Sequence, residues 1–311
     1  HLPPKQRVAR STRANRTIDG TKDFSRRGVF SQFGRILKGA MDVKRKVLAG
    51  LMALLALGGL SSAQAAATYE EEPAAEVQNN AKSAEPKLFP WLKVEDQRRV
   101  LHADGRMVAW VSFPEITVVG DDYPVLQRTL RNWSMEQRRH SDDAEEDLER
   151  AASELMPSFP YYYYEYSVVD RWGRIDDEVV SFALQSASYS GGAHPLHGIV
   201  TVNLHAETGE PISIDEIVAG RDILLLALAD AFRKQYPGRE KDLFTHDIDE
   251  ALAEYHDGGE WQEYLIWMLD ANNDLHVFYN PYDIAPYSAG GFELTLRHDV
   301  YPEVYRRDLT E

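Results

Sequence analysis

The spacing of hydrophobic and polar residues after residue 90 alternates between strand-like and helix-like segments. Residues 94–102 and 107–116 are strand-like and flank Asp104-Gly105, a dipeptide typical of a tight hairpin turn. These two segments are therefore predicted to form antiparallel strands. By the same criteria we predict further strands over residues 160–169, 178–189, 199–206, 264–269, 275–279 and 292–298, with a turn at 171–174.

Two helices are predicted between the second and third strands. Asp121 and Asp122 can cap the first, and Ser141 can cap the second. Hydrophobic residues recur at helical spacing in both, at Leu126, Leu130 and Trp133 in the first and at Ala144, Leu148, Ala152 and Leu155 in the second. Later helices are predicted over residues 214–218, 223–236 and 248–255.

Runs of strands separated by runs of helices favour an α+β fold over a parallel sheet of βαβ units. We predict two small units, an N-terminal one over residues 91–205 and a C-terminal one over residues 206–311. Each unit is expected to have an antiparallel or mixed sheet with helices packed on one face.

Four consecutive tyrosines, residues 161–164, begin the third predicted strand. They can pack the protein interior or form a platform on which sugars stack. Because successive side chains of a strand point to opposite faces, only alternate rings can share one surface. Both interpretations stay open at this point.

The first 90 residues differ from the rest. Residues 41–65 combine a basic start, an apolar run and the sequence Ala63-Gln64-Ala65, which predicts a signal peptide cleaved between Ala65 and Ala66. A retained membrane anchor is the alternative. Residues 1–40 are interpreted as an upstream extension of the gene, or else as a short cytoplasmic tail. Residues 66–90 are interpreted as a flexible acidic linker. Because of the signal-peptide pattern, the protein is expected to be exported to the periplasm or cell surface.

Composition narrows the chemistry. The 311 residues contain no cysteine, which excludes disulfides, thiolate zinc sites, cysteine nucleophiles and iron–sulfur clusters. Residues 66–311 carry 21 Lys and Arg against 47 Asp and Glu, a formal net charge of −26. Such a surface repels nucleic acids and anionic lipids and attracts cationic partners. We therefore expect no nucleic-acid partner, and a membrane association only if the signal peptide is retained.

Tests for metal and nucleophile motifs are negative. Asp270-x-Asn272-x-Asp274 begins like a calcium loop, but Leu275 replaces the required glycine, so we predict a hairpin turn. His194 and His197 have a metal-like spacing without an identifiable third ligand. The chain has no glycine-x-serine-x-glycine elbow and no phosphate-binding loop. We expect no metal and no cofactor.

Two segments resemble a known family. Tyr189-Ser-Gly-Gly-Ala-His194 and Asn280-Pro-Tyr-Asp-Ile-Ala-Pro-Tyr-Ser-Ala-Gly290 are similar to two signatures of an extracytoplasmic module. This module occurs in RsiV-like anti-sigma factors and beside the catalytic domain of PdaC-type peptidoglycan deacetylases. The resemblance covers about residues 91–300. It implies a binding module, because RsiV-like proteins sense lysozyme by direct binding.

The resemblance and the residue types together select candidate contact residues. Glycines permit a tight backbone approach, and tyrosines on a proline-stiffened loop lose little entropy on binding. The candidates are Tyr189, Gly191, Gly192, His194, Tyr282, Pro286 and Tyr287. The same motifs can instead fix turns and dock on each other.

Three functions follow from these candidates. We expect an exported binding module rather than an enzyme, with lysozyme, another cationic protein or peptidoglycan as the ligand. The first alternative is cell-wall deacetylase or amidase activity with His194 as acid or base. The second is a membrane-anchored anti-sigma lysozyme sensor, although the sequence lacks a clear sigma-binding tail.

Overall fold

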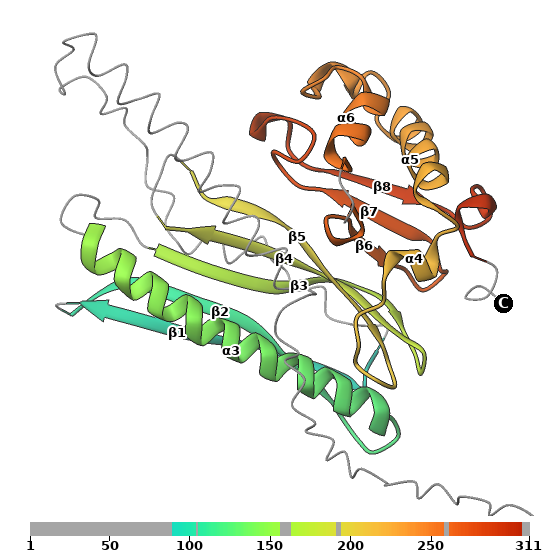
Figure 1. Ribbon diagram of the computed structural model, residues 1–311. Coiled ribbons are helices and arrows are strands. Elements are labelled where there is room, and N and C mark those ends of the chain that lie inside the picture. The colour runs from blue at the N-terminus through green and yellow to red at the C-terminus, as the bar shows by residue number, and fades with distance from the viewer. Residues whose placement is uncertain (1–88, 104, 156–162, 191–193, 258–260, 307–311) are drawn as a thin grey trace, which may run out of the picture.

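The computed structural model describes residues 89–306, with gaps at residues 104, 156–162, 191–193 and 258–260 (Figure 1). The predicted signal peptide, the cleavage site at Ala65 and Ala66, and nearly all of the predicted linker lie outside the described residues. Within the described part, no helix is long and apolar enough to cross a membrane. The architecture is α+β, as predicted, with a five-stranded sheet, a three-stranded sheet and several helices.

The larger sheet has the strand order β1-β2-β3-β4-β5. Its strands are β1 (Leu92–Ala103), β2 (Arg106–Val118), β3 (Tyr163–Ile175), β4 (Val179–Tyr189) and β5 (Leu196–His205). The predicted hairpin around Asp104-Gly105 is confirmed, with β1 and β2 antiparallel. β2 and β3 are parallel over a short stretch, and the pairs β3–β4 and β4–β5 are antiparallel.

A single helix, α3 (Pro124–Leu155), covers one face of this sheet (Figure 1). The prediction of two helices is wrong, and Ser141 does not act as a cap. The segment before Ser141 contains no glycine or proline that would end a helix. The buried Ser141 hydroxyl accepts a hydrogen bond from Arg99 Nη2 at 2.9 Å, so it joins α3 to β1 instead. Arg99 also forms ion pairs with Asp142 and Glu145, which belong to an acidic run over residues 142–149 of α3.

The predicted turn at residues 171–174 is also wrong, because β3 continues to Ile175 and the turn follows it. There, Asp176 Oδ1 accepts hydrogen bonds from the backbone amides of Glu178 and Val179. Gly173 lies inside the strand for a different reason. A Cβ atom on it would lie 2.0 Å from the carbonyl oxygen of Leu269, so glycine permits the two sheets to approach closely.

The smaller sheet is antiparallel, with the order β6-β7-β8. Its strands are β6 (Ile266–Leu269), β7 (Leu275–Tyr279) and β8 (Phe292–Leu296). The helices of this unit are α4 (Ile214–Ile217), α5 (Arg221–Gln235) and α6 (Ile248–Tyr255), with 3₁₀ turns η1 (Arg239–Asp242), η2 (Trp261–Glu263), η3 (Tyr287–Ala289) and η4 (Pro302–Val304). Ser213 begins α4 with a capping box, and Asp247 caps α6.

The two sheets pack against each other, and α5 and α6 cover the far side of the smaller one (Figure 1). Ile266, Met268 and Phe278 of the smaller sheet contact Ala183 and Ile199 of the larger one. Buried polar side chains of the larger sheet pair with the backbone of β6. These bonds are Asn203 Nδ2 to Trp267 O at 2.6 Å, Trp267 N to Thr201 Oγ1 at 3.2 Å and Leu269 N to Ser181 Oγ at 2.9 Å. The smaller sheet therefore covers part of the face opposite α3.

Candidate functional site

Two segments far apart in the sequence meet beside the larger sheet: the residues before β5 and the 280–290 loop between β7 and β8. The ring of His194 stacks on that of Tyr287, with centroids 4.0 Å apart. His194 Nε2 lies 3.2 Å from the Tyr282 hydroxyl, and the rings of Tyr282 and Tyr287 are 5.6 Å apart. We call His194, Tyr282 and Tyr287 the loop cluster. The structure thus brings together three of the seven residues selected from the sequence.

The other four candidates lie elsewhere or are not described. Tyr189 ends β4, where its ring lies 6.2 Å from that of Tyr164. Pro286 begins η3 and lines a separate pocket. Gly191 and Gly192 lie outside the described residues.

Asn280 attaches the 280–290 loop to the larger sheet. Its side-chain Oδ1 accepts a hydrogen bond from Ile199 N at 2.7 Å, and its Nδ2 donates to Ile199 O at 2.9 Å. One side chain therefore satisfies both backbone groups at the open edge of β5. Gly198 makes this approach possible, because a Cβ atom there would lie 2.6 Å from Asn280 Cγ. We call Asn280, Ile199 and Gly198 the Asn280 clamp.

Tyr282 has an unusual backbone conformation, with φ = 77°. Bulky residues rarely adopt this left-handed region, and such residues concentrate at functional sites. The surrounding turn holds it there through hydrogen bonds from Tyr282 N to Ala285 O and from Asp283 N to Asn280 O, both 3.0 Å. The side chain of Tyr282 remains 50% exposed. It is the most solvent-accessible member of the loop cluster.

A partly buried carboxyl lies beneath this turn. Asp283 Oδ2 accepts a hydrogen bond from Asn280 N at 2.7 Å. Burial raises the pKa of Asp283 to about 7, and hydrogen bonds from Asn280 N and the Tyr255 hydroxyl oppose part of this effect. Nearby, His256 Nε2 lies 3.0 Å from the hydroxyl of the buried Tyr279. Burial, followed by the charge of Arg221, lowers the pKa of His256 to about 4, so this imidazole is neutral at pH 7.

The uncovered part of the sheet face opposite α3 carries a row of stacked rings, of which only Tyr164 belongs to the tyrosine run noted in the sequence. Trp110 of β2 stacks on Tyr164 and Tyr166 of β3, with centroids 5.2 and 5.6 Å away. The guanidinium carbon of Arg98 lies 4.3 Å from the Trp110 centroid. We call Arg98, Trp110, Tyr164 and Tyr166 the aromatic ladder.

The aromatic ladder extends toward the loop cluster. Burial raises the pKa of Tyr164 to about 12, with further contributions from its neighbours Tyr166, Tyr189 and Tyr287. Alternation along β3 explains the division of the tyrosine run, because Tyr164 and Tyr166 lie on this face whereas Tyr163 is buried under α3. The sequence signal was present in that alternation, but it does not reveal that Trp110 is the cross-strand neighbour.

The contacts of His194 limit its chemistry. Its Nδ1 lies 2.8 Å from the carbonyl oxygen of Pro195, which can only accept, so Nδ1 carries the proton. Nε2 then accepts a hydrogen bond from the Tyr282 hydroxyl. None of the contacts of His194 among the described residues is with a carboxylate. These contacts orient the ring of His194 for stacking on Tyr287.

Metal binding has no support from the described residues, in which no group of three His, Asp or Glu side chains is placed to hold an ion. The sequence Asp270-x-Asn272-x-Asp274 forms a hairpin turn, as predicted. Asp270 Oδ1 accepts hydrogen bonds from the backbone amides of Asn272 and Asp274, and Asn273 has a positive φ of 63°.

Two solved structures are similar to this chain. A DUF3298 family member from Bacteroides fragilis is 18% identical with a TM-score of 0.48, and the match covers 69% of this chain and 93% of that one. A DUF3298 family protein from Pseudomonas aeruginosa PAO1 is 17% identical with a TM-score of 0.46, covering 70% and 95%. No curated protein matches the chain.

The family model locates the match within the C-terminal unit. Residues 219–299 match the family described as protein of unknown function (DUF3298), a span from the start of α5 past the end of β8. The finer resemblance to RsiV-like and PdaC-type modules stays a prediction. The chain therefore contains a DUF3298 domain, and two members of the loop cluster, Tyr282 and Tyr287, lie inside it.

Proposed function

We propose that this protein is an exported, non-enzymatic binding module that recognises a polypeptide partner through the loop cluster and the neighbouring aromatic ladder. A cationic protein such as lysozyme is the first candidate. The exported location rests on the signal-peptide pattern of residues 41–65.

The observation that carries the proposal is the conformation of Tyr282. Its ring is half exposed, while its backbone is held in a strained conformation by a turn that the Asn280 clamp attaches to the sheet. A preorganised tyrosine presents apolar surface and a hydroxyl at low entropic cost, and tyrosine is enriched at the energetic centres of protein interfaces. The ring of Tyr287 lies 5.6 Å from that of Tyr282 and is itself stacked on His194.

The aromatic ladder favours a polypeptide over a glycan. Sugars stack on the free faces of aromatic rings. Here Arg98 covers one face of Trp110, and Tyr164 and Tyr166 stack on the ring from β3. The stacked rings instead expose their edges and hydroxyl groups to a partner, next to the guanidinium of Arg98. Tyrosine, tryptophan and arginine are enriched in protein–protein interfaces. Binding to peptidoglycan is therefore the second candidate and an outcome of the test.

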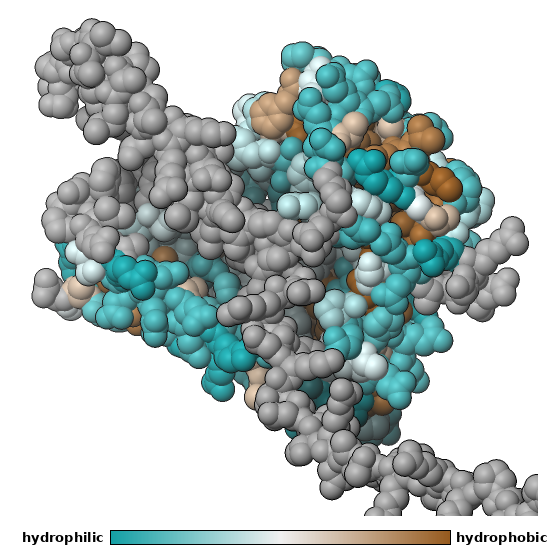
Figure 2. All heavy atoms as spheres, viewed as in Figure 1, coloured by the Kyte–Doolittle hydropathy of each residue, from teal (hydrophilic) through white to brown (hydrophobic). Residues whose placement is uncertain are grey.

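We expect the net charge of the protein to affect the rate of association with a partner more than the stability of the bound complex. The net charge of −26 over residues 66–311 attracts a cationic protein over long distances. The acidic run of residues 142–149 lies on α3, whose surface is largely hydrophilic in Figure 2, on the opposite face from the aromatic ladder. Arg99 also pairs with two of these acids. We therefore expect salt to slow association while the aromatic contacts determine dissociation.

The alternatives have weaker support. Deacetylase or amidase activity would require a carboxylate or metal near His194, and its contacts in the described part include neither. An anti-sigma sensor would depend on residues 1–65, which the structure does not describe.

The test is calorimetry with lysozyme and, separately, with soluble peptidoglycan fragments, on residues 66–311 at low and moderate salt. We expect lysozyme binding that weakens with salt, and at least about tenfold weaker binding for Tyr282→Ala. The matched control is Tyr264→Ala, because Tyr264 is a similarly exposed tyrosine, 42%, outside the loop cluster. Equal losses in the two variants would contradict the proposed site. Absence of lysozyme binding at low salt would exclude lysozyme, and tighter binding of the peptidoglycan fragments would favour a glycan ligand.

A further inference from the structure

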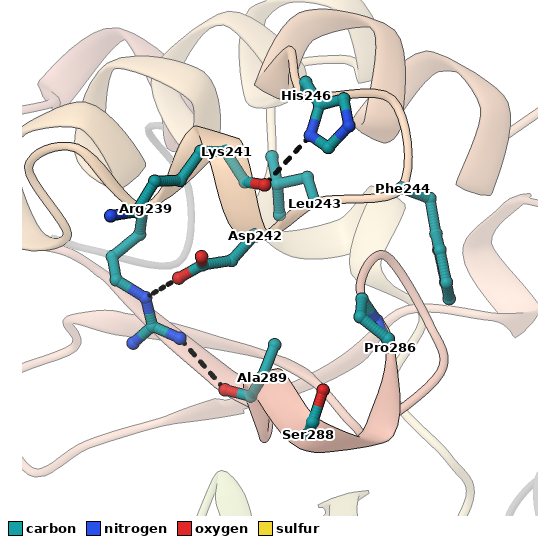
Figure 3. A pocket seen from close by; sticks show the side chains of 9 residues that line it. All are labelled: Arg239, Lys241, Asp242, Leu243, Phe244, His246, Pro286, Ser288 and Ala289. Carbon is teal, nitrogen blue, oxygen red and sulfur yellow. Dashed lines mark hydrogen bonds and ion pairs between the residues drawn. The ribbon is translucent and has the colours of Figure 1, made fainter.

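A pocket of about 480 Å³ lies beside the 280–290 loop, three of whose residues line it (Figure 3). Two segments form its walls: residues 239–246, which follow α5, and residues 286–289. The volume is in the range of sites that bind small molecules. Nothing in the proposed partner recognition uses this pocket.

The pocket is preformed by contacts between its two walls. Phe244 N donates a hydrogen bond to Ile284 O at 3.1 Å, and Arg239 Nη2 donates to Ala289 O at 3.0 Å. Leu243, 1% exposed, anchors the first segment in the core. His246 has a positive φ of 62°, which turns the chain so that its Nδ1 lies 2.9 Å from Lys241 O. Such strain at a pocket wall is typical of a functional site.

The two sides of the pocket differ chemically. Figure 3 shows Phe244 and Pro286 on one side of the hollow and the Arg239 guanidinium on the other. Phe244 is 55% exposed. This side offers an apolar surface to a ligand.

The opposite side is rich in hydrogen-bond donors. Arg239 pairs with Asp242 through Nε and with Ala289 through Nη2, and its Nη1 has no partner among the described residues. The hydroxyl of Ser288 and the ammonium of Lys241 likewise have no partner there. Arg239, Lys241 and Ser288 thus supply donors to the lining of the pocket. Cationic and hydroxyl donors across a hollow from an apolar wall fit an anion that carries an apolar group.

From this arrangement we infer that the pocket binds a small organic carboxylate with an aromatic or apolar group. The carboxylate lies toward Arg239, Lys241 and Ser288, and the apolar group packs between Phe244 and Pro286. Asp242 stays paired with Arg239, so it orients the guanidinium and does not cancel the attraction from Lys241.

Benzoate is a suitable probe, with benzamide as its uncharged isostere and acetate as the ion without a ring. We expect saturable benzoate binding by NMR titration at millimolar concentration, and about tenfold weaker binding of both benzamide and acetate. Phe244→Ala and Lys241→Gln should each weaken benzoate binding about fivefold. Lys93→Gln is the matched control, because it removes the same charge from β1 and should leave binding unchanged.

The outcomes are distinct. Absence of saturable benzoate binding, or equal binding of benzoate and benzamide, would overturn the inference. An equal effect of Lys241→Gln and Lys93→Gln would show that only the overall charge matters and would also overturn it. Because Phe244, Lys241 and Lys93 are exposed, the three variants should keep the melting temperature of the unmodified protein. Unchanged melting temperatures would exclude unfolding as the cause of weaker binding. Lysozyme binding is measured separately, so failure here leaves the proposed function untouched.

Discussion

The Asn280 clamp can be tested by adding a single methyl group. In Gly198→Ala the new Cβ atom would lie 2.6 Å from Asn280 Cγ, which is closer than atoms in contact can approach. The Asn280 side chain must move away, and its hydrogen bonds to Ile199 N and Ile199 O are lost. Each bond contributes about 1 kcal/mol, and the unsatisfied backbone groups add to the cost. We expect the free energy of unfolding to fall by about 2 to 4 kcal/mol.

A double-mutant cycle makes this prediction specific. Asn280→Ala removes the atoms that the new methyl group would meet, at a similar cost on its own. If the clamp is the reason for glycine at 198, the double variant should be no less stable than Asn280→Ala alone. Urea denaturation of residues 66–311 measures all three variants. Additive losses in the double variant would show that Gly198 and Asn280 act independently, which would refute the clamp.

Two further predictions concern the core between the sheets and the buried carboxyl. Gly173→Ala should prevent close packing of the two sheets and lower the free energy of unfolding by several kcal/mol, because its Cβ would lie 2.0 Å from the backbone oxygen of Leu269. The control is Gly220→Ala, which has open space around it and should change the free energy of unfolding little in the same urea denaturation assay. The pKa of Asp283 in the folded protein, about 7, exceeds its ordinary value of 3.8. The native state therefore keeps the proton to higher pH than the unfolded state does. The free energy of unfolding should fall as pH rises from about 4 to about 7, by at most about 4 kcal/mol. Asp283→Asn should remove this part of the pH dependence, and an unchanged profile would contradict the assignment.

Local signals in the sequence were sufficient for most elements. The Asp-Gly turn predicted the β1–β2 hairpin, and the helix over residues 248–255 matches α6 in the structure. The two motifs that carry the family resemblance also selected His194, Tyr282 and Tyr287, which the structure places in contact. These features depend on residues close in sequence or on a recognisable motif.

The errors arise where tertiary contacts override a local signal. Ser141 has the residue type of a helix cap, yet Arg99 from β1 uses its hydroxyl, and α3 continues. Gly173 has the residue type of a turn, yet the neighbouring sheet requires its small size. The aromatic ladder depends on the parallel register of Trp110 and Tyr164, which no pattern within either strand specifies.

The short parallel pairing of β2 and β3 has a consequence for how the protein opens and folds. Among the residues that the structure describes it covers four pairs, from Ala109–Tyr163 to Ser112–Tyr166, whereas β4 and β5 pair over ten. The larger sheet therefore consists of the β1–β2 hairpin and the β3–β5 strands, joined by this short pairing. The helix α3 covers the junction on one face. On the other face Trp110 of β2 stacks on Tyr164 and Tyr166 of β3. Native-state hydrogen exchange should show the amides of β1 and β2 opening as one cooperative group, separately from β3–β5. During synthesis β1, β2 and α3 leave the ribosome before β3. The backbone groups at the edge of β2 therefore stay unpaired until β3 has been synthesised.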